Sequence, residues 1–450
     1  MVYLNKVTSF KNFVVLTLCV FMYANAFAQE KVVLSKEQRL EWFKDAKLGI
    51  FIHWGIYAVN GIDESWSFHN GYISHRDYMK QLEGFNAKNY DPKLWAKLIK
   101  ESGAKYATIT TKHHDGVALW DTKLSDLNTV DKTKAKKDLI KPFVKSLRLE
   151  GLKVGLYYSL LDWSHQDYPN FLRNKKRYIN DEKRWAKFSK FNHGQLKELT
   201  QFEPDLYWFD GDWEQSAEKW KAKEIRDMLL KENPKTIFNS RLQGFGDYAT
   251  PEQGLPISKP ENYYWELCMT MNNSWGYQSN DKDYKSINQI IRILVDCISM
   301  GGNLLLDIGP KADGSIPDEQ RTILKGLGRW TQKHKEAIYG TRSGIPHGHF
   351  NGYTALSKDK KTLYLYLDNK PNGPLVIKGL KNQINRIWVV GNGTKLTHEV
   401  KGKQYWSKVP GLLYVNVPDD VHDKDVTIIA LLLEGEVDLY REEGQKIESN

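Results

Sequence analysis

Cysteine is scarce in this sequence, which has only 3 among its 450 residues. That number is too small for a fold held together by disulfide bonds and excludes a small disulfide-rich scaffold. Two of the three, Cys268 and Cys297, lie in apolar surroundings, and we expect both to be free, buried thiols. Internal repeats and low-complexity tracts are absent as well, whereas hydrophobic residues make up 41% of the chain. We therefore expect a globular protein rather than a disordered or fibrous one.

Long apolar runs are equally rare. Residues 13–22 form one, preceded by Lys6 and Lys11 and followed by a small-x-small pattern at 26–28. Ten residues are too few to cross a membrane, and the pattern is typical of a secretory signal peptide. We expect residues 1–28 to be this signal peptide, with an uncleaved anchor as the alternative. The protein is then exported, either periplasmic or secreted, and we expect no membrane span.

Charge of one sign is in modest excess, with 65 Lys and Arg residues against 55 Asp and Glu, or +10. Such a balance raises the question of nucleic-acid binding. The basic residues do not form a long stripe, since the two clusters at 134–137 and 173–177 are short and suit solvated helix ends. We therefore expect no nucleic-acid partner.

Several catalytic and cofactor motifs are missing. The first apolar run ends in His53-Trp54-Gly55, without the G-x-G-x-x-G of a dinucleotide fold, and no P-loop occurs. H-E-x-x-H, paired cysteines and the G-x-S-x-G of serine hydrolases are also absent. We expect no cofactor, no metal and no serine nucleophile.

What the chain does contain is a regular alternation of strand-like and helix-like segments. The apolar runs lie at 48–54, 106–113, 154–159, 206–210 and 236–241, and helical patterns such as 138–150, 181–200 and 217–231 lie between them. Continuous apolar strands alternating with helices predict a parallel sheet covered by helices. Because nearly every run ends in polar or aromatic residues, we expect a (β/α)8-like barrel over 29–342, with a doubly wound sheet as the alternative.

The pattern changes near Gly340. Short alternating segments separated by Gly, Asn, Asp and Pro turns follow, for example 363–367, 386–390, 413–417 and 426–432. This pattern predicts a C-terminal antiparallel β-sandwich over 343–440, followed by a charged tail at 441–450.

Carboxylates, histidines and tryptophans gather at the predicted strand ends, a combination that suits a carbohydrate. Cleavage of a glycosidic bond needs two carboxyl groups. Asp210 ends an apolar run and is the first candidate, although a turn or helix-capping Asp would look similar. Glu252 lies on a long loop after Arg241, where it is either a catalytic acid or an exposed loop residue. Glu266, at the end of a strand-like run, is its competitor.

The adjacent residues His113 and His114 raise the question of a metal site. Neighbouring residues on a strand point to opposite faces, so both could bind one ion only where the strand ends. No accompanying metal motif is present, and we expect these histidines to contact substrate hydroxyl groups.

Taken in order, these motifs resemble the α-L-fucosidase family, glycoside hydrolase family 29. They are Phe-Ile-His-Trp-Gly at 51–55, Thr-Lys-His-His-Asp-Gly at 111–116, Gly-Leu-Tyr-Tyr-Ser at 155–159, Trp-Phe-Asp-Gly at 208–211 and Gly-Asn-Leu-Leu-Leu-Asp-Ile-Gly-Pro at 302–310. The resemblance implies a retaining exo-hydrolase that releases terminal α-L-fucose from fucosylated oligosaccharides or glycoconjugates. It implies Asp210 as nucleophile and Glu252 as acid/base, with Glu266 as the alternate. The implied sugar contacts are His53, His113, His114, Tyr157, Trp208 and Arg241.

The chain departs from the family pattern at one place. Members commonly have Glu-Trp after the first strand, whereas here Ser65 separates Glu64 from Trp66. We count Glu64 and Trp66 among the sugar-binding residues, but Glu64 either reaches its usual place or loses this contact. Hydrolysis of a related L-sugar such as an α-L-galactoside is therefore an alternative function. A non-catalytic glycan-binding protein on the same scaffold is another. The signature at 307–314 is expected to be a structural turn.

Overall fold

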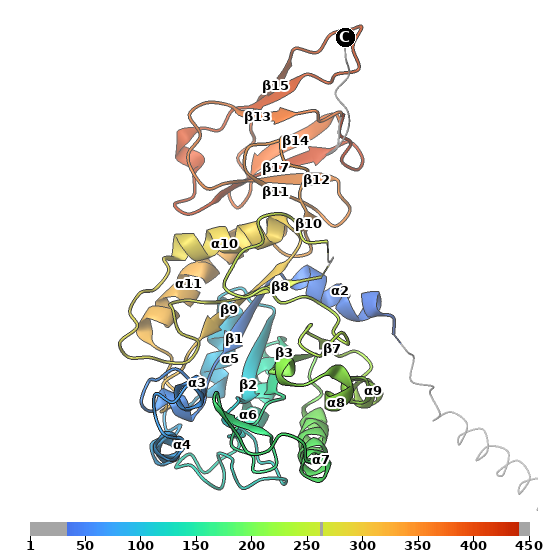
Figure 1. Ribbon diagram of the computed structural model, residues 1–450. Helices are drawn as coiled ribbons and strands as arrows, with labels where there is room; N and C mark the ends of the chain where they lie inside the picture. Colours follow the sequence, from blue (N-terminus) through green and yellow to red (C-terminus); the bar gives the residue numbers. More distant parts are fainter. Residues whose placement is uncertain (1–33, 262–263, 441–450) are drawn as a thin grey trace, which may run out of the picture.

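The computed structural model describes residues 34–261 and 264–440 (Figure 1). The expected signal peptide and charged tail lie outside these residues. A helix-covered barrel and a smaller β-sandwich are stacked one above the other, with helix α10 (Ile287–Ser299) between them. The two-part architecture predicted from the sequence is confirmed.

The barrel wall is a sheet of seven parallel strands in the order β7-β6-β3-β2-β1-β9-β8. Nearly every residue in these strands is buried, as expected for a parallel sheet that is covered on both faces. The strands are β1 (Leu48–Ile52), β2 (Tyr106–Lys112), β3 (Lys153–Ser159), β6 (Leu206–Asp210), β7 (Ile237–Phe238), β8 (Glu266–Thr270) and β9 (Asn303–Ile308).

The strands at the two ends of this sheet are joined by an irregular segment, 248–252, which we call the seam. Tyr248 forms a parallel bridge to Asn239, beyond β7, and Glu252 forms one to Cys268 in β8. The backbone N–H of Cys268 also donates to the carbonyl of Pro251, at 3.1 Å. The seam thus closes the ring in place of a regular eighth strand, which supports the barrel over an open doubly wound sheet.

The strand expected at 236–241 is much shorter than predicted. β7 has only two residues, because beyond the backbone bond from the N–H of Asn239 to the carbonyl of Tyr207 the pairing with β6 passes to the side chain of Asn239. Its amide oxygen accepts from the N–H of Phe209, and its amide nitrogen donates to the carbonyl of Phe209, both at 2.8 Å.

Helices surround the barrel at the places that the apolar periodicity predicts. Asp91 caps α5 by accepting from the N–H groups of Lys93 and Leu94, just before Pro92 opens the helix. The single helix expected at 217–231 is broken, since Lys221 has φ of +56° between two helices. The α-helices are α2 (Lys36–Ala46), α3 (Trp66–His69), α4 (His75–Met79), α5 (Pro92–Glu101), α6 (Ile140–Leu149), α7 (Glu182–Leu199), α8 (Ala217–Trp220), α9 (Ala222–Glu232), α10 and α11 (Asp318–Lys333).

Side chains fill the interior of the barrel. Tyr106 and Leu206, which begin β2 and β6, pack there with Leu305 of β9 and with Leu40 and Phe43 of α2. Helix α2 therefore covers the end of the barrel where the strands begin. The opposite end, where the strands finish, is left for a functional site.

The sandwich has two antiparallel sheets, with strand orders β10-β11-β12-β17-β14 and β13-β16-β15. Along β12, Leu363 and Leu365 face the sandwich core, whereas Tyr364 and Tyr366 pack against the barrel. This two-residue alternation buries both faces of the strand. The strands are β10 (Arg342–Ser343), β11 (Tyr353–Leu356), β12 (Thr362–Leu367), β13 (Leu375–Lys378), β14 (Ile384–Val389), β15 (His398–Lys401), β16 (Leu412–Val415) and β17 (Thr427–Leu433).

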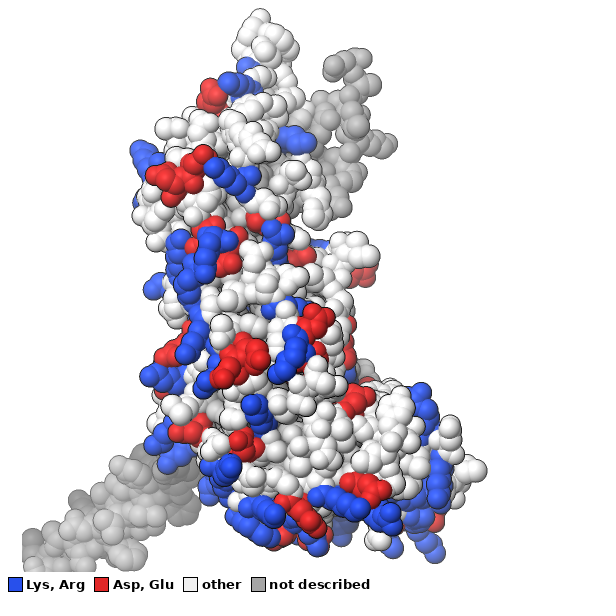
Figure 2. All heavy atoms as spheres, turned by 90° about the vertical axis from the view of Figure 1, so that its left-hand side faces the viewer, with Lys and Arg blue, Asp and Glu red and all other residues white. Residues whose placement is uncertain are grey.

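Three other expectations concern the chain as a whole. Cys268 and Cys297 are buried and free, as predicted. Within residues 34–261 and 264–440, no helix has the length and apolar character needed to cross a membrane. On the face shown in Figure 2, Lys and Arg side chains are interspersed with Asp and Glu rather than gathered in a basic stripe.

Candidate active site

A cavity of about 250 Å³ lies at the carboxyl ends of the barrel strands. Its lining includes every site residue named from the sequence except the alternate Glu266, and none of the described residues of the sandwich. In Figure 1 the helices that follow β1, α3 and α4, lie at the end of the barrel farthest from the sandwich. The lining residues are Phe51, His53, Glu64, Trp66, His113, His114, Tyr157, Trp208, Asp210, Trp213, Arg241, Glu252 and Trp275.

Asp210 is the last residue of β6 and is 8% exposed. The Tyr157 hydroxyl donates to its Oδ2 at 2.8 Å, and Arg241 donates to its Oδ1 at 2.8 Å. Burial alone would raise the pKa of Asp210, but the Arg241 guanidinium and the Tyr157 hydroxyl together hold it below the ordinary value. Asp210 is therefore an ionised carboxylate at the cavity wall, and ionisation is what a nucleophile requires.

Arg241 joins the two candidate catalytic carboxyl groups. One guanidinium nitrogen contacts Asp210, and the other donates to Oε2 of Glu252 at 2.5 Å. The guanidinium group also lies over the Trp208 ring, 4.5 Å from its centroid. Glu252 lies at the end of the seam with 42% of its side chain exposed. One carboxyl group is thus buried and the other is at the rim, and a single cation holds both.

Glu266 lies elsewhere. It is the first residue of β8, so the expectation that it ends a strand and reaches the cleft is wrong. Its carboxyl group is fully buried in the barrel interior, where it accepts from Trp208 Nε1 at 3.1 Å and from the Tyr106 hydroxyl. Burial raises its pKa to about 7. Glu266 supports Trp208 from below rather than facing the cavity.

Each of the three cavity histidines contacts another polar side chain through Nδ1. The contacts are His53 to Asp307 Oδ1 at 2.7 Å, His113 to Ser65 Oγ at 2.6 Å and His114 to Ser159 Oγ at 2.6 Å. Burial lowers the pKa of all three, to about 3 for His53 and about 4 for His114. Neutral rings of this kind suit the binding of hydroxyl groups.

The end of β2 explains how His113 and His114 both reach the cavity. The strand finishes at Lys112, so the alternation of faces no longer applies to the next two residues. Within the described part of the chain, no group of three or more His, Cys, Asp or Glu side chains is arranged to hold a metal ion.

The inserted Ser65 does not remove its neighbours from the site. Glu64 and Trp66 both line the cavity, while Ser65 is buried against His113. Glu64 has a φ of +29° and accepts from the N–H of Gly276 at 2.6 Å. Burial raises the pKa of Glu64 to about 8. The contact that the sequence left in doubt is therefore sterically possible.

Four residues at the site had not been named as sugar contacts. Phe51, Trp213 and Trp275 line the cavity, and Asp307 holds His53 from within β9. The turn expected within 307–314 follows this strand, where the N–H of Gly314 donates to the carbonyl of Lys311 at 2.8 Å. A two-residue spacing places Phe51 on the same strand face as His53, so this residue had a local signal. Trp275 had none, because only the fold brings its segment to the cavity.

Comparisons with known proteins place the chain in one family. A family model described as Alpha-L-fucosidase matches residues 17–336. The chain is similar to an alpha-L-fucosidase of Branchiostoma floridae, at 31% identity over 334 residues, covering 67% of this chain and 72% of the relative. Two solved structures are also similar. Alpha-L-fucosidase isoenzyme 1 from Paenibacillus thiaminolyticus has a TM-score of 0.80 and 35% identity, covering 89% of this chain and 99% of its own. An alpha-L-fucosidase GH29 trapped covalent intermediate from Bacteroides thetaiotaomicron, in complex with 2-fluoro-fucosyl fluoride, has a TM-score of 0.78 and 29% identity, covering 88% and 96%.

Proposed function

Because this chain belongs to the α-L-fucosidase family, glycoside hydrolase family 29, we propose that it is a retaining exo-glycosidase that releases terminal α-L-fucose. Asp210 is the nucleophile and Glu252 is the acid/base. The observation that carries the proposal is the shared guanidinium group of Arg241, which contacts both carboxyl groups at one cavity. Retaining glycosidases need this proximity, with carboxyl groups about 5–5.5 Å apart.

The reaction has two displacement steps. In the first, a carboxylate oxygen of Asp210 forms a bond to the anomeric carbon as the glycosidic C–O bond breaks, and Glu252 gives its proton to the departing oxygen. In the second, Glu252 takes a proton from water, the water oxygen bonds to the anomeric carbon, and Asp210 leaves as a carboxylate. The buried position of Asp210 and the rim position of Glu252 suit these roles.

The lining of the cavity supports fucose over L-galactose. Phe51 lies 5.0 Å from Trp208 and 6.1 Å from Trp275, measured between ring centroids, so these rings form an apolar wall. A methyl group at the sugar's C6 fits such a wall, whereas an added hydroxyl group would lack a partner there. We propose fucosylated oligosaccharides or glycoconjugates as substrates. A comparison of kcat/KM for aryl α-L-fucoside and α-L-galactoside tests this choice.

Substitution of the nucleophile tests the core of the proposal. We expect Asp210→Asn to reduce kcat on an aryl α-L-fucoside on the order of 10³-fold or more, because an amide cannot attack the anomeric carbon. Circular dichroism and the melting temperature show whether the fold is kept. Activity near the wild-type level in a folded variant would overturn the assignment of Asp210.

Azide rescue tests the acid/base. Azide needs no deprotonation, so it restores the second step of a variant that lacks the base. We expect azide to rescue Glu252→Ala and to yield a fucosyl azide with retained configuration. Glu266→Ala is the matched control, and azide should leave its rate unchanged. The opposite pattern would assign the acid/base to Glu266.

Export is also part of the proposal. The apolar run at 13–22 and the small residues at 26 and 28 support cleavage after Ala28. The N-terminus of the protein recovered from cell fractions is expected to be Gln29, and an intact leader on the recovered protein would contradict cleavage.

A further inference from the structure

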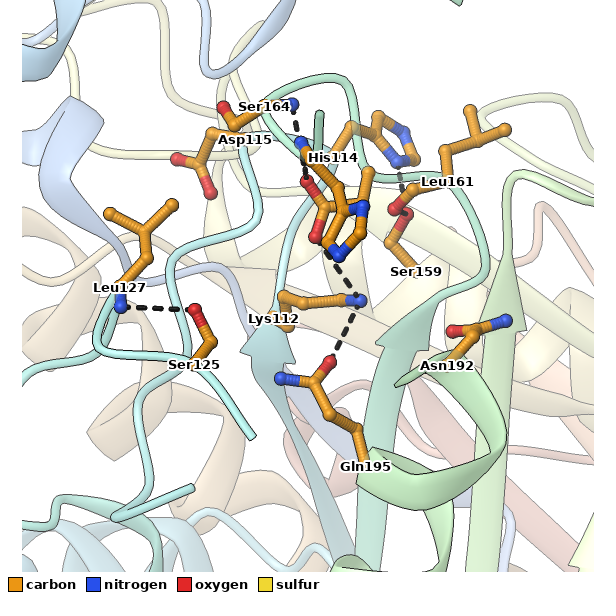
Figure 3. A network of polar contacts seen from close by, with 12 residues as sticks. Lys112, His114, Asp115, Ser125, Leu127, Ser159, Leu161, Ser164, Asn192 and Gln195 are labelled. Atoms are coloured by element: carbon orange, nitrogen blue, oxygen red, sulfur yellow. Dashed lines mark hydrogen bonds and ion pairs between the residues drawn. The ribbon is translucent and has the colours of Figure 1, made fainter. Parts of the chain in front are cut away.

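The imidazole ring of His114 lies between a serine hydroxyl on one side and the proposed nucleophile on the other. Its Nδ1 is 2.6 Å from Ser159 Oγ, and its Nε2 is 3.6 Å from Asp210 Oδ2. His114 follows β2 and Ser159 ends β3, the neighbouring strand. Figure 3 shows the ring of His114 beside Ser159 and Leu161.

The hydrogen atoms of this group can be assigned by counting donors. Ser159 Oγ carries one hydrogen, and it lies 2.8 Å from the carbonyl oxygen of Leu161. A carbonyl oxygen only accepts, so the serine hydrogen belongs to that bond. The contact between Ser159 Oγ and His114 Nδ1 then needs a hydrogen from the ring. His114 therefore carries its hydrogen on Nδ1.

The opposite tautomer satisfies fewer groups. If Nε2 carried the hydrogen, the neighbouring Asp210 Oδ2 would lie 3.6 Å away, which is beyond hydrogen-bond distance, and that oxygen already accepts from the Tyr157 hydroxyl at 2.8 Å. The serine hydrogen would then turn to Nδ1, and the buried Leu161 carbonyl would lose its donor. Burial also lowers the pKa of His114, so the ring is neutral and Nε2 has a free lone pair.

We propose that Ser159 is a positioning residue that fixes His114 as the Nδ1–H tautomer, so that Nε2 accepts a hydrogen bond from one hydroxyl group of the sugar. His114 then requires a donor at that position of the substrate. The tautomer follows from the contacts above, and the sugar contact rests on the function proposed in the preceding section.

His113 offers a matched comparison. Its Nδ1 is also 2.6 Å from a serine hydroxyl, that of Ser65. Among the described contacts, however, Ser65 Oγ has no carbonyl partner that would fix the direction of its hydrogen. The same pair of residue types thus occurs twice in one cavity, with the tautomer fixed in only one of them.

Nitrogen NMR of the full chain labelled with 15N-histidine tests the tautomer directly. The His114 signals are assigned by their loss in His114→Asn. We expect a protonated, pyrrole-type Nδ1 and an unprotonated, pyridine-type Nε2 in the wild type. Ser159→Ala should give a mixture of tautomers, and Ser65→Ala should leave the His114 signals unchanged. An unprotonated Nδ1 in the wild type would overturn the proposal, whether or not either variant folds.

Modified substrates test the consequence. Aryl α-L-fucosides are used in which each hydroxyl group in turn is replaced by hydrogen or by fluorine, which cannot donate. At the position bound by His114, we expect both replacements to lower the wild-type kcat/KM by similar factors, roughly tenfold or more. In Ser159→Ala, the kcat/KM for the fluoro substrate divided by that for the deoxy substrate should rise, because the Nε2–H tautomer can then donate to fluorine.

A wild-type enzyme that tolerates fluorine better than hydrogen at every position would overturn the proposed contact. The parent fucoside separates this outcome from a failure of the proposed function. If the parent is not hydrolysed, the function proposed above fails, while the NMR measurement still decides the tautomer.

Discussion

Glu252 and Glu266 have the same chemical group in different surroundings. Glu252 contacts one arginine at the rim of the cavity, whereas Glu266 accepts from two side chains in the barrel interior. Burial raises the pKa of Glu266 from an ordinary value of 4.5 to about 7. Below pH 7 it is therefore a neutral group inside the protein, which suits support of Trp208 more than proton exchange with substrate.

This shift makes stability depend on pH. The Glu266 carboxyl ionises near pH 4.5 in the unfolded chain and near 7 in the fold, so its contribution is complete below pH 4.5 and lost as pH rises through 7. Between pH 5 and pH 8, ionisation of Glu266 should lower the free energy of unfolding of the wild type by an amount on the order of 3 kcal/mol. We expect Glu266→Gln to lack this decrease. Urea unfolding at several pH values measures it.

The control for this experiment is the exposed Glu83, whose change to Gln should leave the pH profile as in the wild type. Glu64, whose pKa is about 8, contributes to the slope in every variant, so only the difference between profiles reports on Glu266. Identical profiles for wild type and Glu266→Gln would contradict the raised pKa.

Among the elements, the seam is anchored at its start by Asp247. The Asp247 side chain accepts from Arg39 of α2 at 2.7 Å, from Arg226 of α9 at 2.9 Å and from the N–H of Phe238 in β7 at 3.0 Å. Its carboxyl group is fully buried. One residue thus ties two helices and a strand to the segment that ends in Glu252.

We expect Asp247→Ala to lower the free energy of unfolding by about 3–5 kcal/mol, because it leaves the buried Arg39 without its carboxylate partner. Chemical unfolding measures the loss. Asp227→Ala breaks an ion pair with Lys223 in α9 whose side chains are largely exposed, and it should cost less than about 1 kcal/mol. Equal effects of the two substitutions would show that the seam does not depend on Asp247.

The strand ends could be predicted from the sequence, whereas the seam could not. Strand ends are local features, and the two-residue period places Trp208 and Asp210 on one face without any knowledge of the fold. The seam has no such period, since its pairing partners near Asn239 and Cys268 are distant or irregular. Glu266 was misplaced for the same reason, because a short apolar run does not reveal where the strand begins.

At the scale of the whole molecule, barrel and sandwich share one packed interface. The indole N–H of Trp330 in α11 donates to the carbonyl of Val426 at 2.8 Å, and the Tyr366 hydroxyl donates to the carbonyl of Ala337 at 2.5 Å. Trp330 is fully buried. Separating the barrel from the sandwich would therefore expose apolar surface on both of them.

We therefore expect the two parts to unfold in a single calorimetric transition. Trp330→Ala should destabilise the protein by about 3–5 kcal/mol and separate this transition into two. Trp406→Ala is the control, because Trp406 is 70% exposed on the sandwich and its loss should change little. Two transitions in the wild type would contradict shared folding.

The packed barrel interior also determines the order of events at the cavity. Tyr106, Leu305 and the side chains of α2 fill the space beneath it, so nothing can pass through to the other end. Substrate, departing group, water and released sugar all share the mouth. In the proposed two-step reaction, the departing group must leave through that mouth before water can reach the sugar bound to Asp210, and the freed sugar leaves last. A large departing group that dissociates slowly would therefore delay the second step, although the reaction of water with the bound sugar would itself be unchanged.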